Sequence, residues 1–450
     1  MAFVAVEHPD AAAGRAARKR IPLAQHGEWH PASDRPDPVT FFEEQARTRL
    51  PQLVPVRHGR MMASPFAYFR GAALPMAADL APTPTTGFAV QLAGDAHISN
   101  FGLFASPERD LLFDLTDFDE TLRGPWEWDL KRLVASVAVA GRDRGFGGHQ
   151  IGRAVAATAR SYATRMAAYG QLSALEVYYA HVDSAAVMAF VDRRARPYLQ
   201  STVKSAAHHD ALHELPKLTE VKDGVRRIID RPPIIFHPDW GYPELPQTAL
   251  SSYRLTVQED RRDLLDRFEL VDAAMKVVGV GSVGLGSVAA LLLEKGTGNP
   301  LFLQVKEAEA SVLERFLAAS PFEQHGERVV AGQRRLQAAS DVFLGWTIGP
   351  LGHHIYVRQL QDEKGSAVVE AMTHDDLSAW GELCGWTLAR GHARSGYPAA
   401  ITAYLGSPED PALAKAFEAF ASAYADQNER DFQAFLAAIK TGRLAAQPGV

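Results

Sequence analysis

Hydrophobic positions change their spacing several times along the 450-residue chain, and each change predicts a different element. Short apolar runs in GFAVQLAGD, residues 87–95, and in RDLLFDLTDFD, residues 109–119, predict two strands that each lead into acidic residues. The apolar stretch over 126–145 predicts a buried helix, and helical spacing continues to about residue 215. Residues 1–40 are rich in Ala, Arg, Pro and Asp without periodicity, so we expect a loosely ordered arm there.

The second half of the chain has a different order of patterns. Proline is concentrated at 231–247, which predicts an irregular connector, and a charged helix is expected over 258–272. Residues 276–308 then predict a strand, a glycine loop, a second strand, a tight turn and a third strand. The remaining pattern predicts a helix over 326–340, strands over 343–348 and 353–360, and helices over 376–450.

Composition narrows the classes of function. The 47 basic and 53 acidic residues give a net charge of −6, which is not the basic footprint of a nucleic-acid-binding protein. Cys384 is the one cysteine, so an intrachain disulfide and a cysteine-based zinc site are excluded. No apolar run approaches the roughly 20 residues that span a bilayer, and the first residues lack the order of a secretory signal. We therefore expect a cytoplasmic protein without a membrane or nucleic-acid partner.

Carboxylates gather in two neighbouring segments, GDAHISNFG and FDLTDFDE, which end the two expected strands. Asp95 and Asn100 have the D-x-x-x-x-N spacing of a kinase catalytic loop, in which the Asp accepts the substrate hydroxyl proton and the Asn holds a metal. Asp117 opens the DFDE that follows, where a second metal-binding carboxylate is needed, and Asp119 could add a metal contact. Oxygen ligands of this kind, completed by phosphates and water, suit magnesium.

Other polar residues near these segments allow two interpretations. His97 either braces the loop through backbone hydrogen bonds or takes part in the chemistry. Asp114 and Asp119 flank Asp117 at the period of a strand, so some of these carboxylates are expected to serve structure. Arg70 lies in an apolar stretch and therefore needs either a structural carboxylate or a substrate anion.

A glycine-rich segment supplies a second kind of chemistry. Gly279, Gly281 and Gly284 satisfy G-x-G-x-x-G, which occurs in dinucleotide-binding turns, in kinase phosphate loops and in plain hairpins. The dinucleotide version requires a helix directly after the glycines, whereas here an apolar strand carrying Lys306 is expected after the hairpin. A lysine is costly to bury without an anion, so we favour the kinase-like version, in which this loop, with Ser282, and Lys306 hold nucleotide phosphates.

These segments resemble known families. GDAHISN resembles the HGDLHPGN loop of aminoglycoside phosphotransferases and choline kinases, although Ala93 stands where that loop has its first histidine. DFDETLRGPWEWDL resembles their IDFGDAGVGDPAYDL, including the Asp twelve residues on, which is Asp129 here. The chain also resembles, over most of its length, an uncharacterised bacterial family, domain of unknown function 2252. Its hallmarks stand here as SPFAYFRGAA, GDAHISNFG, FDLTDFDET, GPWEWDLKRL, VGVGSVGLG, VRQLQDEKG and LARGHARSG.

The order of these parts differs from that of kinases, because the glycine loop and Lys306 follow the catalytic loop instead of preceding it. A circular permutation accounts for this order, and it predicts that Lys306 approaches Asp117 although the two are far apart in the sequence. The resemblance also implies a helix glutamate that orients the lysine. Glu327 is our choice for this role, with Glu314 and Gln333 as alternatives.

We therefore predict an α+β, protein-kinase-like fold with two lobes in circularly permuted order. Its expected parts are an arm at 1–40, a first C-lobe part at 41–250, an N-lobe-like nucleotide-binding sheet at 251–365 and a helical second C-lobe part at 366–450. The resemblance implies ATP and Mg²⁺ as cofactors and phosphoryl transfer to a hydroxyl group of a small molecule. Nucleotidyl transfer, protein phosphorylation, non-catalytic nucleotide binding and a dinucleotide-dependent oxidoreductase remain as alternatives.

Overall fold

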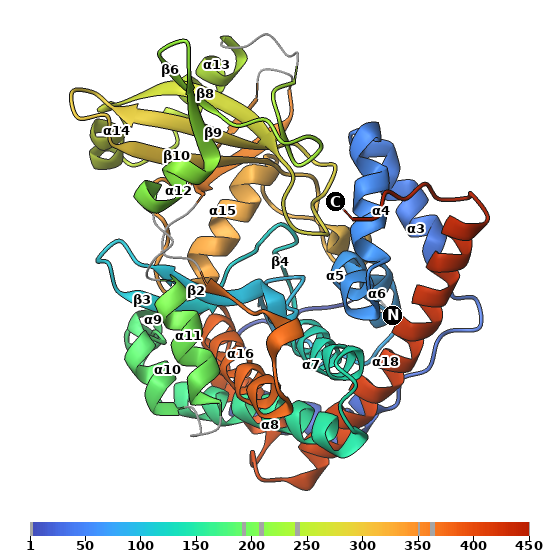
Figure 1. Ribbon diagram of the computed structural model, residues 1–450. Helices are drawn as coiled ribbons and strands as arrows, with labels where there is room; N and C mark the ends of the chain where they lie inside the picture. The colour runs from blue at the N-terminus through green and yellow to red at the C-terminus, as the bar shows by residue number, and fades with distance from the viewer. Residues whose placement is uncertain are drawn as a thin grey trace.

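The computed structural model describes residues 3–190, 195–206, 211–238, 244–349, 352–360 and 365–449. Helices and strands are both abundant, so the predicted α+β class is confirmed. The strands gather mainly in one sheet in the upper part of Figure 1, whereas most helices form the lower part. Within the described ranges, no helix has the length and apolar character needed to cross a bilayer.

The helices of the first half are α1 (Ala11–Arg20), α2 (Ala24–Gly27), α3 (Pro38–Gln45), α4 (Val54–Met61), α5 (Pro65–Gly71), α6 (Ala73–Leu80), α7 (Trp126–Asp143), α8 (Gly148–Tyr169), α9 (Ala174–Tyr179), α10 (Ser184–Phe190), α11 (Arg196–Ala206) and α12 (Ala211–Leu218). Those of the second half are α13 (Glu244–Arg254), α14 (Glu259–Leu265), α15 (His325–Leu336), α16 (His374–Ser395), α17 (Pro398–Leu405) and α18 (Pro411–Lys440). Short 3₁₀ turns are η1 (Ala46–Thr48), η2 (Pro51–Leu53), η3 (Ile98–Asn100), η4 (Val312–Arg315) and η5 (Val369–Ala371).

The strands are β1 (Ala89–Leu92), β2 (Phe101–Ala105), β3 (Leu111–Leu115), β4 (Leu122–Pro125), β5 (Thr219–Lys222), β6 (Val225–Ile228), β7 (Ile235–Phe236), β8 (Phe268–Lys276), β9 (Ser287–Glu294), β10 (Pro300–Glu307), β11 (Gly345–Ile348), β12 (His354–Gln359) and β13 (Gly365–Ser366). In the described part of the chain, the main sheet is antiparallel with the strand order β11-β12-β10-β9-β8-β7. Smaller sheets pair β1 with β4, β5 with β6, and β2 with both β13 and β3.

The main sheet confirms the pattern expected for residues 276–308. Strand β8 ends at Lys276, the glycine segment follows, and β9 and β10 form a hairpin through a tight turn. Lys306, near the end of β10, is paired with Ser287 on one side and with Tyr356 on the other. Helix α15 follows β10 and packs on β11 and β12, between the sheet and the helical part (Figure 1).

The helical part is built around α7, which is buried from Trp126 to Gly141. A helix that is buried on all faces shows no amphipathic period, and residues 133–141 of α7 are accordingly apolar on every face except at Ser136. Helices α8 and α16 pack closely because Gly381 and Gly385 face Thr158, where an added Cβ would lie 2.3 Å from Oγ1 and 2.5 Å from the carbonyl oxygen. This close contact fixes α16 beneath the acidic segments.

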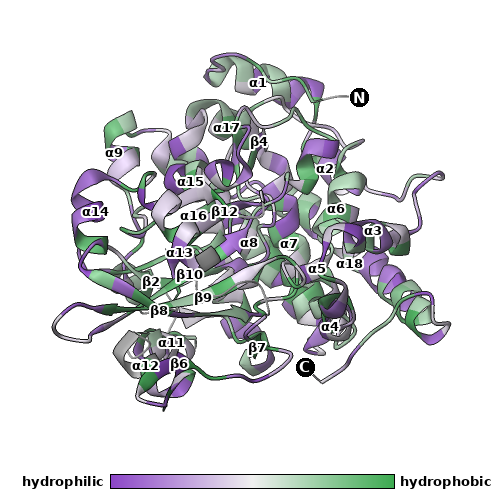
Figure 2. Ribbon diagram, turned by 90° about the horizontal axis from the view of Figure 1, so that it is seen from above, coloured by the Kyte–Doolittle hydropathy of each residue, from purple (hydrophilic) through white to green (hydrophobic). Residues whose placement is uncertain are grey.

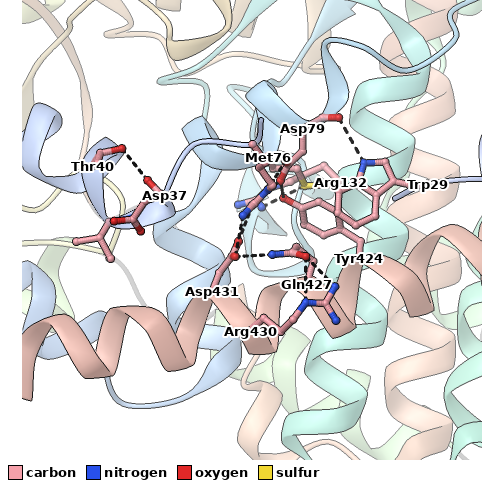
Figure 3. Close-up of polar contacts among 12 residues, drawn as sticks. Trp29, Asp37, Thr40, Met76, Asp79, Arg132, Tyr424, Gln427, Arg430 and Asp431 are labelled. Carbon is pink, nitrogen blue, oxygen red and sulfur yellow. Dashed lines mark hydrogen bonds and ion pairs between the residues drawn. The ribbon is translucent and has the colours of Figure 1, made fainter. Parts of the chain in front are cut away.

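Residues 3–40 differ from the expected loose arm. Helix α1 is capped by the Asp10 side chain and packs along α17. Arg35 donates to both carboxylate oxygens of Asp79 at 2.6 and 2.8 Å, and to those of Asp431 at 2.9 and 2.6 Å. Figure 3 shows Asp79 and Asp431 in this cluster with Tyr424, whose hydroxyl donates to Asp79 at 3.1 Å. These contacts join segments from opposite ends of the chain, so local periodicity could not reveal them.

The connector expected at 231–247 is only partly irregular. Strand β7 lies within it and pairs with β8, and α13 begins at Glu244, while residues 239–243 lie outside the described ranges. The charged segment over 258–272 is also divided, into α14 and the start of β8. Because β7 belongs to the main sheet, the sheet begins before the expected boundary at residue 250.

Candidate active site

A cavity of about 580 Å³ lies between the main sheet and the helical part. It collects most of the predicted site residues, although they come from distant segments. Those that line it are Asp95, His97, Asn100, Asp117, Asp119, Gly279, Gly281, Ser282 and Lys306. The predicted acidic and basic parts therefore face one cavity.

Lys306 reaches the acidic segment directly. Its Nζ atom lies 2.5 Å from Oδ2 of Asp119 and 3.7 Å from Oδ1 of Asp117, which confirms the predicted approach of Lys306 to Asp117. The lysine side chain is only 4% exposed, so its charge needs these carboxylates. Burial lowers the pKa of Lys306, but Asp117 and Asp119 outweigh it, and the pKa is raised overall. The lysine therefore stays protonated.

Asp119 is held at both oxygens. Oδ2 accepts from Lys306, and Oδ1 accepts from the Tyr356 hydroxyl at 2.6 Å. Its carbonyl accepts from Arg328 of α15 at 2.8 Å. Burial raises the pKa of Asp119, but the Lys306 charge and the hydrogen bonds from Lys306 and Tyr356 outweigh it and lower the pKa. Asp119 is thus the main anionic partner of the lysine and not a free metal ligand in this state.

Asp117 is the carboxylate that remains available. Its Oδ1 is buried and accepts no hydrogen bond within the described ranges. Burial raises the pKa of Asp117, and the neighbouring Asp119 adds to this. The Asn100 Nδ2 donates to the Asp95 carbonyl at 2.8 Å, which directs the amide oxygen away from that contact. A carboxylate and an amide oxygen of this kind fit a magnesium ion that takes its other ligands from phosphate and water.

The protein atoms alone do not form a complete metal cage. No group of three or more His, Cys, Asp or Glu side chains in the described part of the chain is arranged to hold a metal ion. Magnesium can be bound through one or two protein carboxylates, because that ion keeps several waters and binds substrate phosphates. Asp117 with Asn100 is the pair that would hold it.

Asp95 is held by Arg132 of α7. Arg132 Nε lies 2.8 Å from Asp95 Oδ1, and its Nη2 lies 2.7 Å from the same oxygen. Burial raises the pKa of Asp95, against the charge of Arg132. His97 Nε2 lies 3.6 Å from Asp95 Oδ2, and burial lowers the pKa of His97 well below its usual value, so the imidazole is neutral. Asp95 is therefore an oriented carboxylate with its second oxygen toward the cavity residues.

Two contacts fix the loop that carries Asp95. Gly94 has φ +84°, and an added Cβ would lie 2.2 Å from the Glu120 carbonyl oxygen, so only glycine allows the two acidic segments to approach. The Asp129 carboxylate accepts from the backbone N–H of Ala93 at 2.7 Å and of Gly94 at 3.0 Å. His392 of α16 lies 3.2 Å from the same carboxylate. Ala93, which stands where the phosphotransferase loop has its first histidine, is thus held through its backbone N–H group.

The glycine segment forms a loop, not a helix start. Gly279 and Gly284 have φ +67° and +94°, a conformation that favours glycine, and β9 begins at Ser287, soon after Gly284. The helix required by the dinucleotide-binding alternative is therefore absent from this described stretch. Gly284 does not line the cavity; its Cα faces Arg49, whose Nη1 donates to the Val283 carbonyl.

Helix α4 and the segment that precedes it contact this loop. Arg60 Nη1 donates to the Gly279 carbonyl at 2.7 Å, and the Leu50 N–H donates to the Gly284 carbonyl at 2.8 Å. Figures 1 and 2 show α4 and α5 beside the strands of the main sheet and not stacked on its face. The loop is therefore supported from the N-terminal helices.

The prediction that Glu327 orients Lys306 is wrong. Glu327 lies on a different surface depression, with Tyr178 and Arg334. Glu314 accepts from the backbone N–H groups of Ser311 and Ser320, so it caps a turn instead. The physical reason is that Asp119 of the acidic segment is already the anionic partner of Lys306. Helix α15 instead contributes Arg328, which donates to the Asp119 carbonyl.

Four functional side chains were not singled out from the sequence: Arg132, Arg328, Tyr356 and Arg358. Arg358 donates to the Thr116 carbonyl at 2.8 Å and to Gln304 at 3.0 Å, which braces the acidic turn from β12. Arg132 follows Asp129 by one helical turn, so both face the Asp95 loop from one side of α7. The spacing from Asp129 could therefore have identified Arg132 from the sequence. The positions of Arg328, Tyr356 and Arg358 depend on the fold.

Asp114 has a structural role, which is one of the two interpretations of the acidic strand. Both of its oxygens lie 2.7 Å from Nη2 of Arg390, and both residues are almost completely buried. The Ala338 N–H also donates to it at 2.8 Å. Asp114 thus joins β3 to α16 beneath the cavity.

Comparison with curated proteins and with solved structures found no match to this chain. A family model matches residues 49–438, which is most of the chain and includes every residue of the cavity described above except Gln45. The chain therefore belongs to the family described as uncharacterized protein conserved in bacteria (DUF2252).

Proposed function

We propose that this protein is an ATP-dependent phosphotransferase that moves the γ-phosphoryl group to a hydroxyl group, with Mg²⁺ as cofactor. The observation that carries the proposal is that a glycine loop, the buried Lys306 and the acidic pair Asp117 and Asp119 meet at one cavity. Phosphoryl transfer needs positioned cations and oxygen ligands around the phosphates, and these residues supply both.

Each side chain has a role in this proposal. Lys306, which pairs with Asp119 in the structure, would pair with the nucleotide phosphates when ATP is bound. The loop at residues 279–282 would cover these phosphates with its backbone N–H groups. Asp117 and Asn100 hold the metal ion, which neutralises phosphate charge. Asp95 accepts the proton of the acceptor hydroxyl as the acceptor oxygen bonds to the γ-phosphorus and the bond to the leaving ADP oxygen breaks.

The order of elements supports a two-lobed, circularly permuted kinase-like arrangement. In kinases the glycine loop joins the first two strands of a lobe and the lysine lies on the third. Here β8, the glycine loop, β9 and β10 with Lys306 have this order, followed by α15 and the strands β11 and β12. The helix α16 then contacts the catalytic-loop region through His392 and Asp129.

The main alternative is a nucleotide-binding regulator of the same fold that has no turnover. The pairing of Asp95 with Arg132 supports catalysis, because it holds a carboxylate beside the cavity in one orientation, as a general base requires. Nucleotidyl transfer and protein phosphorylation would use the same cavity, and the mass of the product separates them from small-molecule phosphorylation.

The test is ATP turnover by the purified protein with Mg²⁺, with Asp117→Ala and a matched control, Asp110→Ala. Asp110 is exposed and precedes β3 of the same hairpin, so its removal leaves the cavity unchanged. We expect Asp117→Ala to lose turnover with folding intact and Asp110→Ala to keep it. Equal turnover in the two variants would end the assignment.

A further inference from the structure

Two buried arginines and a partly buried one form a second charged wall of the cavity. Arg49, Arg57 and Arg70 come from the segment that runs from η1 to α5, and Arg49 contacts the glycine loop through the Val283 carbonyl. Arg57 is 1% exposed and Arg49 is 8% exposed, while Arg70 is partly buried. All three line the same cavity as Asp95 and Asp117.

This wall lacks the anions that buried arginines normally have. Arg35, Arg132 and Arg390 each have a carboxylate partner within 2.8 Å. In contrast, none of the arginines of the wall has a carboxylate of a described residue at ion-pair distance. Arg57 instead donates Nη2 to the Gln45 amide and to the Gly71 carbonyl, both at 3.1 Å. A buried guanidinium without an anion is costly, so the wall is built for an anion that comes from outside.

Several donors of the wall remain unused. Buried nitrogens that donate to no atom of the described chain are Arg49 Nε, Arg57 Nε, Arg57 Nη1 and Arg70 Nε. Guanidinium groups with free N–H forks match the oxygens of phosphate and carboxylate groups. The unused donors, together with the absence of an ion pair at these arginines, indicate an anionic ligand.

Arg70 is the arginine of this wall that lies near the proposed base, Asp95. Arg70 follows Phe69, whose carbonyl accepts from Arg132 at 2.7 Å and whose ring lies 3.8 Å from the Arg132 guanidinium carbon. Since Arg132 also holds Asp95, Arg70 lies beside the proposed base. Lys306 and the glycine loop, which would hold the nucleotide phosphates, come from β10 and from the connection between β8 and β9.

We propose that Arg70, with Arg57 and Arg49, binds an anionic group, a phosphate or a carboxylate, of the acceptor that is to be phosphorylated. This inference rests on the proposed phosphotransferase function and narrows its acceptor to hydroxyl compounds that carry an anion. The anion would place the acceptor hydroxyl at Asp95, which is the positioning that phosphoryl transfer requires.

The test is calorimetric titration of inorganic phosphate, and separately of acetate, into the full chain, both alone and saturated with Mg²⁺ and a non-hydrolysable ATP analogue. Arg70→Gln is compared with Arg47→Gln, because Arg47 is an exposed arginine of the adjoining η1 turn that does not line the cavity. We expect saturable binding of one of the two anions, weakened about tenfold or more in Arg70→Gln and unchanged in Arg47→Gln. Which anion binds distinguishes a phosphorylated acceptor from a carboxylate acceptor.

Three results would overturn this inference: no saturable binding of either anion, equal binding in the two variants, or binding that the ATP analogue abolishes. The last result would assign the arginines to the nucleotide phosphates. Arg49→Gln provides a second variant if thermal unfolding shows that Arg70→Gln is not folded. Failure of the phosphotransferase proposal is seen separately: the analogue itself then does not bind, while Arg70-dependent anion binding persists.

Discussion

The Nζ atom of Lys306 lies 2.5 Å from Oδ2 of Asp119, although 187 residues separate them in sequence. This ion pair joins the main sheet to the acidic hairpin, and Asp117 lies next to it at 3.7 Å. A charge that is 4% exposed and two neighbouring carboxylates are stable here because they compensate one another. A nucleotide phosphate that entered the cavity would replace a carboxylate as the anionic partner of Lys306.

Lys306→Met is expected to lower the free energy of unfolding by about 2–3 kcal/mol, because it leaves two neighbouring carboxylates without their cation. The partial exposure of Asp119 keeps the loss below that of a fully buried pair. Urea unfolding measures it, with the exposed Lys415→Met as the control. Adding Asp119→Asn to Lys306→Met should recover part of the loss. Equal stabilities of the Lys306→Met and Lys415→Met proteins would show that the pair does not form.

Gly94→Ala is expected to cost at least about 2 kcal/mol more stability than Gly145→Ala, because only the first change adds a steric clash to the backbone penalty. Both glycines have positive φ, at +84° and +73°, so both changes carry a similar conformational penalty of about 1–2 kcal/mol. A Cβ at Gly94 would also meet the Glu120 carbonyl at 2.2 Å, whereas nothing lies within 4 Å of one at Gly145. Denaturant unfolding of the two variants gives the difference. Similar losses would mean that the two acidic segments are farther apart.

Glu120 predicts a pH dependence of stability. Burial raises its pKa to about 7 from 4.5, against the Val312 N–H that donates to it at 2.8 Å. Between pH 4.5 and about 7 the folded protein therefore holds a proton on Glu120 that the unfolded chain has lost. This proton stabilises the folded protein, and the stabilisation is lost as the pH rises through the folded pKa of about 7. Glu120→Gln should remove it, so its stability relative to wild type should rise by about 1–2 kcal/mol across this window, because Glu120 retains some solvent contact.

The measurement for Glu120 is urea unfolding of wild type and variant at a series of pH values. Glu108→Gln is the control, since Glu108 is exposed in the turn between β2 and β3. Its stability curve should run parallel to that of wild type. If the Glu120→Gln curve is also parallel, Glu120 is ionised in the folded protein at neutral pH.

Arg132→Gln tests the orientation of Asp95 under the proposed function. The change removes the contacts at 2.7 and 2.8 Å that hold Asp95 Oδ1. We expect turnover to fall on the order of 10²-fold while the affinity for Mg²⁺ and ATP stays within about twofold. Steady-state kinetics and nucleotide titration separate the two effects, with the exposed Arg153→Gln as the control. A loss of affinity equal to the loss of turnover would assign Arg132 to folding or to nucleotide binding.

Much of the site could be predicted because its residues lie in short segments with strong local patterns. The Asp95 and Asn100 spacing, the DFDE segment, the glycine loop and a lysine in an apolar strand are all visible in one sequence. The sequence also predicted that these segments meet, because a buried lysine needs a carboxylate or phosphate beside it. The closeness of Lys306 to Asp117 is the part that the structure bears out most clearly.

What could not be predicted depends on contacts between distant segments. Nothing local shows that Asp119 rather than Glu327 pairs with Lys306, because this depends on how α15 packs on the sheet. Residues 3–40 likewise have a defined conformation because Arg35 forms an ion pair with Asp431, near the other end of the chain. The unpaired arginines could be recognised only after their surroundings were known.

The most direct test of the central claim is calorimetric titration of ATP into wild type and Asp117→Ala, with and without Mg²⁺. If the cavity holds a metal–nucleotide complex, wild type binds ATP at one site and binds it more tightly with Mg²⁺. Asp117→Ala should then lose the Mg²⁺ dependence while it keeps its fold. Failure of wild type to bind ATP, or the same Mg²⁺ dependence in both proteins, would contradict the account.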